Sequence, residues 1–232
     1  MSEPQCTVSL TYNGATLNQT EVVVPALDQF GFRGTFYADP IPFLENLGAW
    51  KSAYEKGHEM GVGSLLSSCL PDGSLPSWTP DMILDDLCEC EELLEEFLPV
   101  PSGRSLGLPL GSSLCAEGEN YLPQLTQFRA IRSGVVGMNL WSEVDFRTLM
   151  CLPMNELSGE QMIDAVRMGM KHPSFLVLSF DGVGEGEQGV DAAQHANLLQ
   201  FLDQSRDLVR VLSVIECYHL HRKVRLDSLQ LS

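Results

Sequence analysis

The sequence lacks the marks of a secreted or membrane-inserted protein. Its N-terminus, Met1-Ser2-Glu3-Pro4-Gln5, has neither the basic nor the apolar stretch of a secretory signal. No apolar run approaches the roughly 20 residues that a membrane-spanning helix needs. The seven cysteines are odd in number and irregularly spaced, which favours reduced thiols. We therefore expect a cytoplasmic protein that does not bind membranes.

Basic residues are scarce. The 232 residues include 31 Asp and Glu but only 14 Lys and Arg, for a formal net charge of −17. This excess repels phosphate backbones and anionic lipid headgroups, so we expect neither nucleic acid nor a membrane as a partner. The 44% hydrophobic content is enough to bury a substantial core.

Strand-like and helix-like segments alternate along the chain. Short runs rich in β-branched and aromatic residues predict strands, whereas apolar residues at helical spacing predict helices. The predicted strands are residues 6–12, 34–38, 106–110, 175–180 and 209–212. The predicted helices are residues 19–30, a stretch through Trp50 and Tyr54, 80–98, 158–171, 191–203 and a last helix that includes 217–221. This alternation predicts an α/β fold with a parallel sheet or barrel.

The clearest predicted helix covers residues 80–98. Thr79 is a suitable N-cap, and Pro80 fits the first turn. One apolar stripe consists of Ile83, Leu87, Cys90, Leu94 and Phe97. The remaining surface carries Asp85, Asp86, Glu89, Glu92 and Glu96, which predicts a solvated, strongly negative outer face. A basic protein docked on this face is one hypothesis for a partner.

Three segments carry the motifs of one known family in the same order. They are Ser9-Leu10-Thr11-Tyr12-Asn13-Gly14, Phe30-Gly31-x-x-Gly34-Thr35-Phe36-Tyr37 and Gly57-His58-Glu59-Met60-Gly61. They resemble polysaccharide deacetylases of the NodB type, which have at these places a strand ending in Thr-Phe/Tyr-Asp-Asp, a Gly-x-x-Ala/Gly-Thr-Phe-Phe segment and Gly-His-Glu-Ile/Leu-Gly. Weaker matches are Leu108-Pro109-Leu110-Gly111 and the strand end at Ser179-Phe180-Asp181. The resemblance implies one domain over residues 1–232, with its core at about 6–222, folded as a distorted, often seven-stranded (β/α) TIM-like barrel.

The family's metal ligands and catalytic residues do not match this sequence. Members remove acyl groups with a metal, usually zinc, that is bound by an Asp and two His residues, while another Asp is the base and a late His the acid. Asn13 stands at the base position and Asp181 at the late His position. The ligand positions hold Gly14, Gly63 and Ser67, and no histidine lies between residues 59 and 171. Because catalytic zinc needs about three protein ligands, we expect no metal cofactor and no ordinary hydrolysis.

Polar side chains are still expected at the barrel mouth, because the carboxyl ends of barrel strands line the pocket. The candidates are Tyr12, Asn13, Tyr37, Asp39, Ser64 and Asp181. Our first hypothesis is an inactive binding or regulatory module of the carbohydrate-metabolism type, whose partner is a carbohydrate, a small amide or another protein. The second is an active hydrolase of C–N or ester bonds in a sugar or small amide, with an altered site around Asp181 and Asn13.

Other motifs favour structural interpretations. Gly184-x-Gly186-x-x-Gly189 resembles a dinucleotide loop, but Glu185 and Glu187 would repel a pyrophosphate. Cys69 is a candidate reactive thiol near the mouth, without a histidine nearby in sequence to activate it. We expect His195 to be a buried structural residue and His58 to have a packing role.

Overall fold

The protein folds into a closed barrel of seven parallel strands. The structure, a computed structural model, describes residues 6–65, 78–186 and 189–230. The barrel order is β1-β2-β3-β4-β5-β7-β8, and β8 closes the ring by pairing with β1. The closure confirms the (β/α) barrel expected from the alternation and from the family resemblance.

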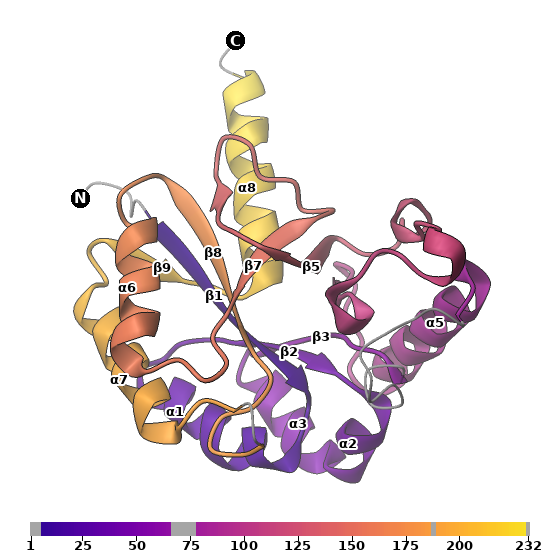
Figure 1. The fold of residues 1–232 in the computed structure, drawn as a ribbon, viewed down its shortest axis with the longest axis horizontal. Helices are drawn as coiled ribbons and strands as arrows, with labels where there is room; N and C mark the ends of the chain where they lie inside the picture. The colour runs from indigo at the N-terminus through magenta and orange to yellow at the C-terminus, as the bar shows by residue number, and fades with distance from the viewer. Residues whose placement is uncertain (1–5, 66–77, 187–188, 231–232) are drawn as a thin grey trace.

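The five predicted strands correspond to four barrel strands and to β9, whereas the barrel strands at 59–62, 130–136 and 149–153 were not predicted. The barrel strands are β1 (Cys6–Gly14), β2 (Thr35–Ala38), β3 (Glu59–Val62), β4 (Ser105–Gly107), β5 (Ala130–Val136), β7 (Leu149–Pro153) and β8 (Ser174–Phe180); β6 (Asn139–Leu140) and β9 (Val209–Val211) lie outside the ring. The helices are η1 (Gln19–Val23), α1 (Val24–Gln29), α2 (Pro40–Glu45), α3 (Leu47–Glu55), α5 (Pro80–Phe97), α6 (Gly159–Gly169), α7 (Ala192–Gln204) and α8 (Val214–Gln230). Figure 1 shows α8 extending away from the barrel, with the C-terminus at its tip.

The first strand organises the barrel through three neighbours. Over its first seven residues β1 pairs with β8, from Cys6 opposite Ser174 to Tyr12 opposite Phe180. On its other edge, the first residues of β1 pair with β9 and its last residues pair with β2. The side chains alternate between two environments, as a strand requires. Leu10 and Tyr12 pack in the main core beneath the helices, whereas Thr11 contacts Arg132 of β5 across the barrel.

One helix begins as its sequence favours, and another departs from its predicted surface. Ser158 caps α6 with the reciprocal hydrogen bonds of a capping box, in which Gln161 is the partner. In α5, however, Asp86 does not belong to the solvated face. Its side chain is only 8% exposed, and its carboxylate accepts hydrogen bonds from the Ser64 hydroxyl and the Leu65 amide. The helical pattern alone did not reveal that a polar loop covers this position.

The amino-terminal ends of the strands form the base of the barrel, where Glu59 holds the start of α8. Its carboxylate accepts hydrogen bonds from the Thr35 hydroxyl at 2.8 Å, from the Ile215 amide at 2.9 Å and from the Ser105 hydroxyl. Negative charge at a helix N-terminus is favourable, because the first amides there lack partners within the helix. Glu59 therefore joins β2, β3, β4 and α8. Among the described residues, no helix is both long and apolar enough to cross a membrane.

Candidate functional site

A cavity of about 650 Å³ opens at the barrel mouth, where the carboxyl ends of the strands meet. Asn13, Tyr37, Asp39 and Asp181 line it, so four of the six predicted pocket residues come together. Parallel strands bring their carboxyl ends to one side of a barrel, which explains why residues far apart in sequence share this cavity. Its volume falls within the range of small-molecule sites.

Two predicted pocket residues lie elsewhere. Tyr12 is fully buried on the helix side of β1, because neighbouring strand residues face opposite sides and Asn13 takes the inner one. There its hydroxyl is 2.8 Å from Nε2 of His195. Ser64 is also fully buried and binds Asp86 instead of lining the cavity. Their placement at the mouth is therefore corrected.

The sequence reading missed Arg132 of β5, which lies at the centre of the floor. One guanidinium nitrogen donates to the Ser179 hydroxyl at 2.8 Å and the other to Oδ1 of Asn13 at 2.8 Å. The guanidinium also lies 4.6 Å from the centre of the Tyr37 ring, a cation–π distance. Tyr37 fits because Gly61 of β3 leaves room for it: a Cβ at Gly61 would lie 2.7 Å from the ring. Residues 130–136 were not among the predicted strands, so Arg132 was not recognised as a candidate.

Asn13 and Asp181 are held in a hydrogen-bonded chain. The Asn13 amide donates to Oδ1 of Asp181 at 2.5 Å, while its carbonyl oxygen accepts from Arg132. The Asn155 amide, which the sequence reading also missed, donates to the other oxygen of Asp181. Both Asp181 oxygens are thus acceptors for amide groups, and the residue is exposed. These hydrogen bonds fix the orientation of polar atoms at the cavity, but Asn13 offers no basic atom for proton transfer.

The two glycines at the positions that the family resemblance assigns to metal ligands disfavour larger side chains, for different reasons. At Gly63, a Cβ would lie 2.6 Å from the Ala38 carbonyl oxygen and 2.6 Å from Oδ1 of Asp39. At Gly14, the backbone has a φ of +97°, where side chains other than hydrogen are strained. The Asp39 carboxylate lies close to both glycines. The backbone itself therefore differs from one that would present ligands at these positions.

The residues present do not fit a catalytic zinc ion. Within the described part of the chain, no three His, Cys, Asp or Glu side chains are grouped closely enough to hold a metal. Burial raises the pKa of Asp39 to about 6, with a smaller contribution from Asp86, so its carboxyl group is partly protonated near neutral pH. Ser67, the remaining ligand position, and Cys69 lie outside the described residues.

One further nucleophile lines the cavity. The thiol of Cys151 donates to the Ser133 carbonyl oxygen at 3.2 Å, and burial raises its pKa. A raised pKa favours the thiol over the reactive thiolate. No histidine is among the residues that line this cavity. Cys151 consequently lacks the activation that a catalytic cysteine requires.

The remaining sequence candidates have structural roles. His195 is 1% exposed, and burial lowers its pKa to about 4. His58 accepts from the Gly34 amide and contacts Asp28 at 3.2 Å. In the glycine-rich segment, Val183 and Val190 form a bridge, and Asp191 caps the next helix through the Ala193 amide. That cap uses an amide that a bound phosphate would need.

Comparison with solved structures identifies the fold. A protein from Mycobacterium smegmatis assigned as a polysaccharide deacetylase has a TM-score of 0.71 at 15% identity, covering 97% of this chain and 92% of that one. A family 4 acetyl xylan esterase from Clostridium thermocellum, in complex with cobalt, has a TM-score of 0.65 at 17% identity, covering 92% and 91%. A mutant CE4 pseudoenzyme with restored enzymatic activity has a TM-score of 0.57 at 14% identity, covering 94% and 69%.

These structural similarities extend over almost the whole chain, whereas the similarity in amino-acid sequence is low. No protein-family model matches the sequence, and no curated protein matches it. The chain therefore has the fold of the CE4 polysaccharide deacetylases, the fold that the three sequence segments predicted. At identities of 17% and below, the activity of those proteins does not follow from the likeness.

Proposed function

We propose that this polysaccharide-deacetylase-like protein binds a carbohydrate or a small acyl amide at the barrel mouth without hydrolysing it, and acts as a binding or regulatory module. The observation that carries the proposal is the backbone at Gly14 and Gly63. One glycine has a left-handed conformation, and a Cβ at the other would lie 2.6 Å from a carbonyl oxygen, so a side chain at either position would be strained. Without a metal, the family's water activation and acyl polarisation have no source.

The mouth nevertheless retains the features of a polar binding site. Asp181 presents a carboxylate that two amides orient, and Arg132 is fixed by three polar side chains and the Tyr37 ring. Sugars and acyl amides carry both hydrogen-bond donors and acceptors. A neutral ligand of this kind can therefore donate to the Asp181 carboxylate and accept from a donor elsewhere in the cavity. The structural similarity to a family 4 acetyl xylan esterase and to a CE4 pseudoenzyme supports a carbohydrate as the first ligand to test.

Binding and turnover can be measured on the same samples. N-acetylglucosamine oligosaccharides and acetylated xylo-oligosaccharides would be titrated by calorimetry, and released acetate would be assayed with and without added zinc. We expect saturable binding without acetate release. Asp181→Ala should weaken binding about 10-fold, as expected for loss of a hydrogen bond to a charged group.

The matched control is Asp207→Ala, an exposed carboxylate outside the residues that line the mouth. It changes the net charge equally and should leave binding intact. Acetate release that depends on Asp181 would contradict the proposal and favour the altered hydrolase. Absence of binding to every oligosaccharide and amide tested would leave a protein partner as the remaining form of a regulatory module.

A further inference from the structure

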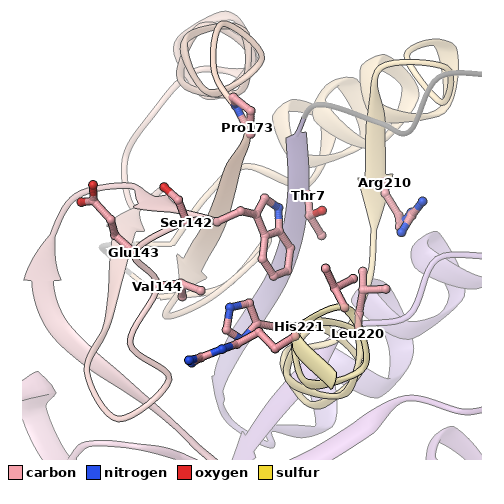
Figure 2. A pocket seen from close by; sticks show the side chains of 11 residues that line it. Thr7, Ser142, Glu143, Val144, Pro173, Arg210, Leu220 and His221 are labelled. Atoms are coloured by element: carbon pink, nitrogen blue, oxygen red, sulfur yellow. The ribbon is translucent and has the colours of Figure 1, made fainter. Parts of the chain in front are cut away.

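A second cavity lies at the opposite end of the barrel from the mouth, and its volume is about 590 Å³. It is bounded by the first residues of β1, by β9, by the segment 141–144 that follows β6, and by α8. Figure 2 shows Thr7 and Arg210 on the strand side, with Leu220 and His221 on α8. The segment 142–144 forms the facing wall. None of its lining residues lines the mouth.

The charge around this cavity is opposite to that of the chain as a whole. Arg210 and Arg225 line it, whereas its acidic lining residue is Glu143. His221 also lines it, but burial lowers the pKa of its imidazole, so it adds little positive charge near neutral pH. The chain as a whole has a net charge of −17, so a pair of guanidinium groups beside one cavity is unusual here. Such a pair favours an anionic occupant.

Arg210 is the main anchor for such an anion. It is partly buried, and it makes no hydrogen bond or ion pair within the described residues. By contrast, Arg33 and Arg206 each bind a carboxylate. A guanidinium withdrawn from water without a partner is costly, and its planar donors fit a carboxylate or a phosphate. Because Arg210 pairs with Thr7 in the parallel register, the Thr7 hydroxyl stands beside it on the same wall.

The opposite part of the cavity is apolar and already rigid. The Trp141 indole stacks on Phe175 at 5.5 Å and on His221 at 5.9 Å, and Phe175 is fully buried. The indole N–H donates no hydrogen bond within the described residues. Val144 and Leu220 complete this wall. Aromatic rings held by buried neighbours form a wall that needs no rearrangement when a ligand binds.

We infer that this cavity is a binding site for a small amphipathic organic anion, whose carboxylate or phosphate binds Arg210 and whose apolar part lies against Trp141. The site is independent of the proposed function of the mouth. A polyanion such as a nucleic acid is unsuited to it, because the rest of the chain is strongly negative.

The test uses 8-anilinonaphthalene-1-sulfonate as the probe and N-phenyl-1-naphthylamine as its uncharged counterpart. The full chain should bind one sulfonate probe, and amide chemical shifts should change in residues 141–144 and 220–225 rather than around Gly14 and Gly63. Arg210→Gln should lower the affinity for the charged probe on the order of 10- to 100-fold and leave the affinity for the uncharged probe unchanged. Arg222→Gln is the matched control, since Arg222 is on α8 but outside the lining. Its effect should be below about 3-fold.

Competition distinguishes the two anion chemistries. Displacement of the probe by 2-naphthoate or by 2-naphthyl phosphate identifies a carboxylate or a phosphate as the preferred group, and displacement by neither overturns the inference. Equal weakening by Arg210→Gln and Arg222→Gln also overturns it, as do shift changes confined to the mouth. If Arg210→Gln fails to fold, Val144→Glu provides a second test, because it places a carboxylate in the facing wall and should likewise abolish binding of the charged probe.

Discussion

The two ends of the barrel use ionisable residues in different ways. At the base, Glu59 and His58 are enclosed and bonded to neighbouring elements, and Glu59 connects three strands to the start of α8. At the mouth, Asn13 stands at the position that the family resemblance assigns to the base, and two glycines stand at positions that it assigns to metal ligands. Asp181 faces solvent there. The base thus carries the side chains that hold the fold together.

The largest effect is expected from breaking the base. Glu59→Ala removes the shared acceptor of the Thr35 hydroxyl, the Ser105 hydroxyl and the Ile215 amide. Buried donors left without a partner cost about 1–3 kcal/mol each, so the free energy of unfolding should fall by about 3–5 kcal/mol. Denaturant unfolding measures this, with the exposed Glu55→Ala as control. An unchanged midpoint would show that the base is not structural.

A second substitution tests whether the mouth backbone excludes side chains. Gly63→Ala places a Cβ 2.6 Å from the Ala38 carbonyl oxygen, and we expect a loss of about 2–4 kcal/mol in the free energy of unfolding. Gly48→Ala in α3 is the control, because nothing lies within 4 Å of a Cβ there. It should stabilise by about 0.5–1 kcal/mol. Equal, small effects at both glycines would mean that Gly63 can accept a metal ligand.

Asp39→Asn tests whether a buried charge at the mouth makes the stability of the protein depend on pH. The pKa of Asp39 is raised to about 6 by burial, so between about pH 4 and pH 6 the folded protein keeps a proton that the unfolded chain releases. Stability contributed by this proton is complete below about pH 4 and is lost as the pH rises through about 6. Asn keeps an acceptor for the Ser64 amide without the buried charge.

The Asn variant should consequently be more stable than the parent by about 1–3 kcal/mol at pH 7 and equal to it near pH 4. Urea unfolding at both pH values provides the measurement. A stabilisation that persists unchanged at pH 4 would mean that the charge of Asp39 is not its cause.

The smallest effect is expected at Tyr12, which the structure places outside the mouth. Tyr12→Phe removes the hydroxyl that contacts Nε2 of the buried His195. The free energy of unfolding should fall by about 1 kcal/mol, while ligand binding at the mouth should remain unchanged. Thermal unfolding and calorimetric titration test the two parts. Loss of binding without loss of stability would return Tyr12 to the pocket.

The alternation of strands and helices predicted an α/β fold with a parallel sheet or barrel, because these periodicities are local properties of the chain. The family resemblance implied the barrel. The sequence also located Asn13 and Asp181 at the mouth, since both follow or end clear strands. Arg132 and Asn155 escaped it, because their importance comes from contacts across the barrel: Arg132 meets Asn13, which is 119 residues away in sequence. Similarly, the closeness of Gly63 to the Ala38 carbonyl oxygen arises from the packing of β3 beside β2 and has no sequence pattern.

The most direct test of the central claim is the zinc stoichiometry of the protein, measured by calorimetric titration at neutral pH together with acetate release from an acetylated oligosaccharide. The account predicts no stoichiometric zinc binding, no zinc-dependent acetate release, and saturable binding of the oligosaccharide. One zinc ion bound per chain, with hydrolysis that follows its occupancy, would contradict the account and make the protein an active deacetylase with a different set of metal ligands.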